Sequence, residues 1–134
     1  MASAATGYVG LSLIQEVEKG LPVSALDHLV RSLAPNDAAF AFRLVPRATL
    51  ARRRTGDARV ARLSPAEGAR VARLAKVWAM AREVWKDDDA AREFLFRPHM
   101  LLGGRPPVDV VLASEFGGPL VENILGGLLY GTAV

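Results

Sequence analysis

The stretch SPAEGARVARLAKVWAMAREVW, residues 64–85, decides the fold more than any other part of the chain. Ser64 and Glu67 have the spacing of a helical capping box, and Pro65 occupies the first helical position between them. Apolar residues then recur at intervals that place them on one continuous helical stripe. Its members are Val71, Leu74, Trp78, Ala81 and Trp85. The pattern predicts one long helix with a single buried face.

Segments on both sides of this helix show the same helical periodicity, and the alternating pattern of strands is absent. Glycine and proline residues separate the segments from one another. The sequence therefore predicts an all-α fold, in which an N-terminal helix-turn-helix bundle is followed by a small helical domain. The expected helices span residues 8–18, 22–33, 37–44, 47–54, 65–85, 90–96, 107–113 and 119–131.

Composition excludes several classes of protein. The 134 residues are 51% hydrophobic and 23% charged, which is typical of a globular chain rather than a disordered one. There are no cysteines, so disulfides and zinc ribbons are excluded, and a cytoplasmic location is expected. Residues 1–7 lack the basic residue of a signal peptide, and the apolar tail 121–134 is too short and polar to span a bilayer.

Charge is distributed unevenly along the chain. Residues 43–82 contain 11 basic and 2 acidic residues, a local net charge of +9. Residues 1–42 carry −2 and residues 83–134 carry −4, which together give the overall +3. A polyanion is a natural partner for the basic middle, whereas the two acidic ends need a different partner.

Three expected helices, 22–33, 37–44 and 47–54, have the spacing of a helix-turn-helix. In that motif the helix after the turn lies in the major groove of DNA, with its first residues nearest the bases. Leu50 is the expected core anchor of this helix, and Arg47 and Thr49 are the candidates for base contacts. The candidates for phosphate contacts are Arg52, Arg53 and Arg54. The alternative is that the segment is an arginine-rich helix exposed to solvent.

Residues that bring chemistry are scarce. His28 and His99 lie far apart, and no pattern matches a zinc site, a phosphate-binding loop or a catalytic triad. The run Asp87-Asp88-Asp89 stands where a helix begins, so capping explains it better than metal binding. We therefore expect no catalytic residue, no metal, no cofactor and no enzymatic activity.

Two segments carry a resemblance to a known family. The stretch LVPRATLARR, residues 44–53, resembles the Xre-like helix-turn-helix signature. Farther along, PHMLLGGRPP at 98–107, SEFG at 114–117, LG at 125–126 and YG at 130–131 resemble the toxin-binding domain of Xre/MbcA/ParS-type antitoxins. Gly127 is a departure, because relatives usually carry a basic residue there.

The resemblance implies a function in a type II toxin–antitoxin system. The implied protein partner is a RES-domain toxin that degrades NAD, and the C-terminal domain would cover the active site of this toxin. The implied second partner is operator DNA, which a homodimer of the chain would bind in order to repress transcription. The residues implied in toxin binding are Leu102, Gly103, Gly104, Arg105, Pro107, Glu115, Tyr130, Gly131 and Val134. The glycines and prolines among them have an alternative explanation, which is that the fold itself requires them.

The change in charge near residues 85–89 divides the chain. We expect a DNA-binding and dimerisation region at residues 1–86 and a toxin-binding domain at residues 87–134. Two alternatives to the antitoxin interpretation are an orphan helix-turn-helix repressor that has no toxin partner and an interaction module that binds no DNA.

Overall fold

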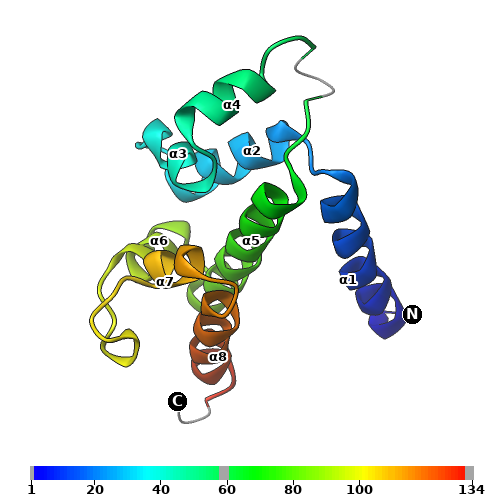
Figure 1. The fold of residues 1–134 in the computed structure, drawn as a ribbon. Coiled ribbons are helices and arrows are strands. Elements are labelled where there is room, and N and C mark those ends of the chain that lie inside the picture. The colour runs from blue at the N-terminus through cyan, green and yellow to red at the C-terminus, as the bar shows by residue number, and fades with distance from the viewer. Residues whose placement is uncertain (1, 58–60, 132–134) are drawn as a thin grey trace. The chain divides into compact units, whose positions relative to one another are not determined.

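The regular structure of the chain is helical, as the sequence predicts. A computed structural model describes residues 2–57 and 61–131, and the side chains from residue 11 onward within these ranges. In these ranges it contains eight α-helices and two short 3-10 helices, and no strand (Figure 1). The helices are α1 (Ala2–Lys19), α2 (Val23–Leu33), α3 (Ala41–Leu44), α4 (Arg47–Arg53), α5 (Pro65–Trp85), α6 (Asp88–Phe96), α7 (Pro107–Ala113) and α8 (Gly117–Tyr130), with η1 (Ala38–Phe40) and η2 (Met100–Leu102) between them.

The helices group into two compact units. The N-terminal unit comprises residues 1–32 and 37–72, and the C-terminal unit comprises residues 33–36 and 73–134. Helix α5 begins in the first unit and ends in the second. The expected division into a DNA-binding region and a toxin-binding domain after residue 86 concerns function, and it stays a prediction.

The N-terminal unit is closed by a short pairing between the segments that precede α2 and α5. The Leu63 amide donates to the Leu21 carbonyl at 2.7 Å, and the Val23 amide donates to the Ala61 carbonyl at 3.0 Å. Gly20 ends α1 with φ +95°, and a Cβ there would lie 2.8 Å from the Leu63 carbonyl oxygen. Only glycine fits this conformation and this close approach. The buried apolar side chains of the unit are Val23, Leu26, Leu29, Val30, Phe40, Ala41, Leu44, Val45, Leu50, Leu63 and Val71.

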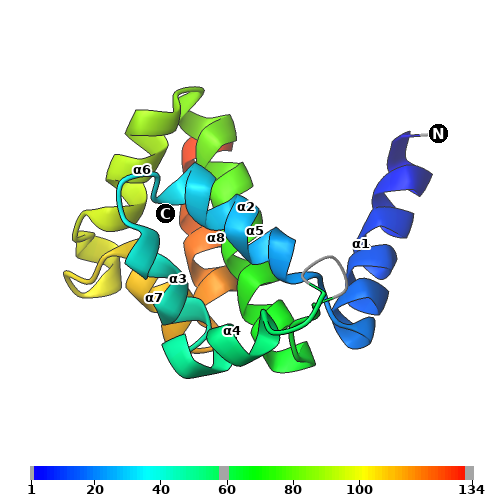
Figure 2. The same ribbon diagram turned by 90° about the horizontal axis from the view of Figure 1, so that it is seen from above.

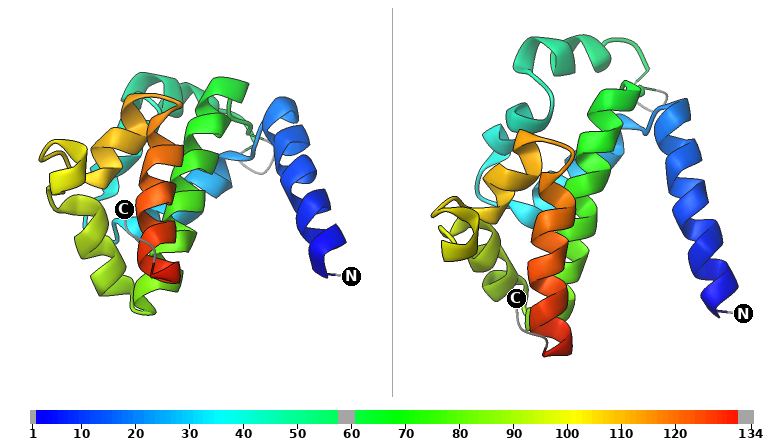
Figure 3. Two further views of the ribbon diagram at one scale, coloured as in Figure 1. Left: turned by 90° about the horizontal axis from the view of Figure 1, so that it is seen from below. Right: turned by 60° about the horizontal axis from the view of Figure 1, so that its bottom comes forward.

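The C-terminal unit packs α6, α7 and α8 with the second half of α5. Figure 3 shows α8 lying beside that part of α5, and Lys76 Nζ lies 3.0 Å from Glu122 Oε1 between them. The stripe predicted on α5 is buried at Leu74, Trp78 and Ala81. The buried side chains contributed by the other helices include Ala91, Leu95, Val108, Val111, Val121, Ile124 and Leu125.

Several predicted helix ends were displaced. Helix α8 begins at Gly117 rather than Pro119, because Gly117 and Gly118, which were expected to separate two helices, form its first turn. Helix α6 begins at Asp88 rather than Ala90, with Asp87 as its cap. Trp85 is only partly buried, whereas Val77, which the predicted stripe omitted, is fully buried.

Gly117 permits a close approach between α7 and α8. A Cβ at this position would lie 1.8 Å from the Val110 carbonyl oxygen and 2.6 Å from its carbon. These are backbone atoms of α7, which cannot rotate away as a side chain can. The glycine is therefore required by the packing of α7 against α8.

We expect Gly117→Ala to lower the free energy of unfolding by more than about 2 kcal/mol, because the new methyl group must force α7 and α8 apart. Gly126→Ala is the matched control in the same helix, since a Cβ there meets no atom within 4 Å. It should stabilise the chain by up to about 1 kcal/mol through helix propensity. Urea denaturation followed by the fluorescence of Trp78 and Trp85 measures both changes. Equal midpoints for the two variants would contradict the packing argument.

Candidate functional site

The turn between α3 and α4 has the geometry that its sequence predicts. Val45 ends α3 in an extended conformation, with φ −138° and ψ 126°, as a residue before proline prefers. Pro46 follows as the N-cap of α4, and its carbonyl accepts the Leu50 amide at 2.9 Å. Leu50 is buried, which confirms it as the anchor of α4. Figure 2 shows the short connection from α3 into α4.

The predicted DNA-binding residues fall into two groups. Arg47 and Arg52 are exposed and Thr49 is partly buried, and neither arginine is paired with a carboxylate among the described residues. The Arg47 guanidinium lies over the ring of Phe42, 4.2 Å from its centroid. This group is free to contact a ligand.

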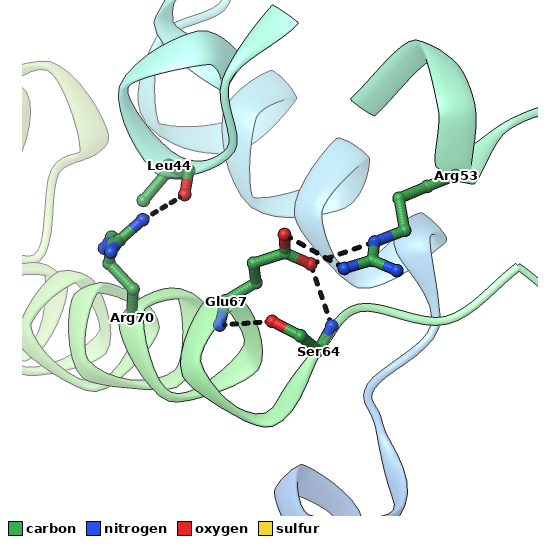
Figure 4. A network of polar contacts seen from close by, with 5 residues as sticks. All are labelled: Leu44, Arg53, Ser64, Glu67 and Arg70. Atoms are coloured by element: carbon green, nitrogen blue, oxygen red, sulfur yellow. Dashed lines mark hydrogen bonds and ion pairs between the residues drawn. The ribbon is translucent and has the colours of Figure 1, made fainter. Parts of the chain in front are cut away.

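Arg53 belongs to the second group, because it is held by a carboxylate of α5. Its Nε donates to Glu67 Oε1 at 3.2 Å and its Nη2 donates to Oε2 at 3.3 Å (Figure 4). Glu67 Oε1 also accepts the Ser64 amide at 2.8 Å, while the Ser64 hydroxyl accepts the Glu67 amide at 3.2 Å. The predicted capping box is confirmed, and it is joined to α4 through one arginine.

Arg54 is held in the same way by α2. Its Nη2 and Nη1 donate to the two carboxylate oxygens of Asp27, at 2.7 and 2.9 Å. The hydrogen bond that Arg54 donates to Asp27 raises the pKa of Arg54, burial opposes this rise, and the negative charge of Asp27 adds to it. Phosphate contacts by Arg53 and Arg54 stay predictions, and the ion pairs give both side chains a structural role.

Helix α5 also holds the end of α3. Arg70 Nη1 donates to the Leu44 carbonyl at 2.6 Å, which satisfies an acceptor that the last turn of α3 leaves open (Figure 4). Glu67 and Arg70 thus fix α4 and α3 from one face of one helix. The orientation of the predicted DNA-reading helix is set by these contacts.

Burial raises the pKa of Glu67, but the hydrogen bonds from Ser64 and Arg53 and the positive charge of Arg53 outweigh this and lower it. The carboxylate is therefore stabilised in its charged form by the fold. The Glu67 side chain is 12% exposed and that of Arg53 is 31% exposed, so water screens the pair only partly.

The predicted toxin-binding loop is a tightly closed turn in the C-terminal unit. The His99 amide donates to the Arg105 carbonyl at 3.1 Å, and the Gly104 amide donates to the His99 carbonyl at 3.0 Å. Gly103 and Gly104 have φ of +66° and +80° and, like Arg105, are exposed. His99 Nδ1 accepts the Leu101 amide at 3.2 Å.

The remaining toxin-binding candidates differ in exposure. Leu102 and Pro107 are buried, so both support the loop from within. Glu115 is exposed between α7 and α8, Tyr130 is 77% exposed at the end of α8, and Gly131 closes that helix with φ +71°. Val134 lies outside the described residues. Figure 3 shows the loop (yellow) and the end of α8 (red) on separate parts of the C-terminal unit.

Three large apolar side chains exposed on this unit, Met100, Leu101 and Phe116, were not among the predicted binding residues. Met100 is 90% exposed and Leu101 is 52% exposed, at the tip of the closed turn. Phe116 is 76% exposed between α7 and α8, and Leu120 and Leu128 are also exposed. The available signal was the run of three large apolar residues, Met100 to Leu102, directly before a glycine turn, where polar residues are usual.

Within the ranges that the structure describes, no group of three or more His, Cys, Asp and Glu side chains could hold an ion. The Asp87 side chain accepts the Ala90 amide at 2.9 Å, which confirms the predicted capping role. No helix of the described chain is long and apolar enough to cross a membrane.

Comparison with protein families gives two matches that together cover most of the chain. Residues 12–76 match the antitoxin Xre-like helix-turn-helix domain. Residues 80–131 match the antitoxin Xre/MbcA/ParS C-terminal toxin-binding domain. Comparison with curated proteins finds no match. The first match includes α2 to α4 and the polar contacts of Figure 4, and the second includes the closed turn and α8.

We expect Glu67→Gln to lower the free energy of unfolding at pH 7 by about 1 kcal/mol, because glutamine keeps the capping box but loses the charge that faces Arg53. The folded state lowers the pKa of Glu67, so the wild-type advantage is complete above the unfolded value of about 4.3. It is lost as the pH falls through the lower folded value. Denaturation followed by circular dichroism across this range measures the gap between the two proteins.

The matched control is Glu83→Gln, because the Glu83 side chain is exposed and no ion pair involves it among the described residues. Its stability should follow that of the wild type at every pH. A gap between wild type and Glu67→Gln that stays constant down to about pH 3 would contradict the assignment of the charge effect to Glu67.

Proposed function

The chain belongs to the Xre/MbcA/ParS-type antitoxins, and from this premise we propose that it neutralises a RES-domain toxin that degrades NAD and that it represses its own operator. An antitoxin role in a toxin–antitoxin system follows from the two family matches. Families of this kind are typically non-enzymatic, and we propose that the chain acts by binding alone, in the cytoplasm.

The proposed inhibition is steric. The observation that carries it is the closed turn of residues 99–105, which presents Met100 and Leu101 to solvent inside the segment matched to toxin binding. Its backbone hydrogen bonds already fix the turn, so little conformational entropy is lost when a partner binds. Large apolar side chains on such a turn are suited to fill an apolar part of the toxin's active-site entrance.

The proposed operator contact uses the exposed face of α4. Arg47 at its first turn is suited to base edges, and Arg52 farther along is suited to phosphates. Thr49 lies between them in sequence and completes the predicted base-reading set. We propose that two copies of the chain bind together, because helix-turn-helix proteins commonly read two half-sites related by two-fold symmetry.

We expect this chain to rescue cells that express a RES-domain toxin encoded beside it. With the toxin alone, growth should stop and cellular NAD should fall, and co-expression should restore both. Measured growth and NAD decide the matter. Continued loss of NAD while the chain is soluble and folded would contradict the proposed partner and favour an orphan repressor.

Two variants locate the inhibiting surface in the same assay. Replacing Met100 and Leu101 by glutamate should abolish rescue, because charge replaces the exposed apolar tip. Leu11→Glu is the matched control, since Leu11 is 53% exposed, comparable to Leu101, and lies outside both family matches. A chain that ends at Leu129 should also fail to rescue growth, because it lacks the predicted toxin-binding residues Tyr130, Gly131 and Val134.

We expect the double variant Arg47→Ala, Arg52→Ala to bind operator DNA at least tenfold more weakly while it still neutralises the toxin, because each arginine contact with DNA contributes about 1–3 kcal/mol. Electrophoretic mobility shifts give the dissociation constants, and the stoichiometry gives the number of chains per operator. The control is Lys19→Ala with Lys86→Ala, which removes equal charge from exposed positions that have no ion pair among the described residues. If the control loses as much affinity, the assignment to α4 fails.

A further inference from the structure

Phe42 and Arg47 face each other across the turn that joins α3 to α4. The Arg47 guanidinium carbon lies 4.2 Å from the centroid of the Phe42 ring, a direct cation–π contact. The contact of Arg43 with the Phe40 ring is longer, at 5.4 Å. Phe42 is therefore the aromatic platform nearest to a residue of the predicted base-reading set.

The platform leaves the hydrogen-bonding capacity of Arg47 unused. A guanidinium has five N–H donors. Arg53 and Arg54 each use two of these donors in hydrogen bonds to a carboxylate, whereas Arg47 faces a ring. A phenyl ring accepts no conventional hydrogen bond, so the contact with Phe42 restrains the plane of the Arg47 group without occupying its donors. The Arg47 guanidinium is thus held in one orientation, and its N–H donors are available to a ligand.

The position of the platform is fixed by the fold. Helix α3 is held at its end by the hydrogen bond from Arg70 to the Leu44 carbonyl, and its neighbours Ala41 and Leu44 are buried. Phe42 itself is only partly buried and is not among the core side chains. Its ring is therefore held by a rigid helix, while the core does not depend on it.

We propose that Phe42 is a positioning residue for sequence recognition, because its ring presets the Arg47 guanidinium to donate two hydrogen bonds to one base in the major groove. Guanine, with two acceptors on its major-groove edge, is the base that this geometry suits. The inference rests on the proposed operator binding. It concerns discrimination between sequences, because contacts with phosphates need charge but no fixed plane.

The test starts from DNA sequences that the wild-type protein selects from a random duplex library. Dissociation constants are then measured for the selected duplex and for a scrambled duplex of equal composition. Phe42→Leu should reduce the ratio of the two constants about tenfold, because leucine preserves apolar bulk but offers no π face. Phe42→Tyr should keep the ratio, since its ring supplies the same platform. Thermal unfolding checks that each variant is folded.

A double-mutant cycle separates positioning from general support. Arg47→Lys keeps the charge and loses the planar fork, so it should reduce the ratio by itself. Adding Phe42→Leu to Arg47→Lys should then have almost no further effect, because the platform has lost the group that it orients. A loss of affinity that is equal for both duplexes, or effects of the two substitutions that simply add, would overturn the inference.

Operator binding and the positioning role of Phe42 are refuted by different results. If the wild type selects no sequence and binds both duplexes alike, the proposed operator function fails and the role of Phe42 fails with it. If the wild type discriminates and Arg47→Lys loses discrimination while Phe42→Leu retains it, only the positioning role is refuted.

Discussion

The N-terminal unit depends on the hydrogen bonds and the ion pair made by the Glu67 carboxylate. This carboxylate accepts the Ser64 amide at the start of α5 and at the same time receives both donors of the Arg53 fork from α4. One turn later, Arg70 reaches the carbonyl end of α3. A single helical face therefore begins one helix and orients two others. Short helices such as α3 and α4 are too short to be stable alone, so contacts of this kind determine where they point.

Close backbone packing and a tight turn shape the C-terminal unit, in addition to ion pairs such as that of Lys76 with Glu122. Gly117 lets α8 start against the backbone of α7, and the closed turn at residues 99–105 is shaped by two glycines with positive φ. These constraints keep apolar side chains such as Met100 on the outside. The buried apolar residues thus come mainly from the helices, and a small set of large apolar side chains stays exposed, which suits the binding surface proposed above.

Local patterns in the sequence predicted the helix caps and the buried anchor of α4, but they did not reveal contacts between residues far apart in the chain. The capping box at Ser64 and Glu67, the cap at Asp87 and the anchor at Leu50 depend on neighbours a few residues away, so their spacing was sufficient. The partners of Arg53 and Arg54 lie 14 and 27 residues away. No periodicity reveals such a pair, which is why a run of three arginines was assigned to phosphates as a group. The exposure of Met100 was equally invisible, because burial depends on the packing of the whole unit.

The internal ion pairs have a consequence for counterions. A protein that binds DNA releases condensed cations in proportion to the phosphates it neutralises, about 0.9 for each phosphate on duplex DNA. Arg53 and Arg54 already face Glu67 and Asp27, so exchanging these carboxylates for phosphates gains little. The entropic attraction to arbitrary DNA is therefore smaller than the 11 basic residues of the segment 43–82 suggest. For the proposed repressor, this means that less of the protein would be held by unrelated chromosomal sequence and a larger share would stay available for its operator.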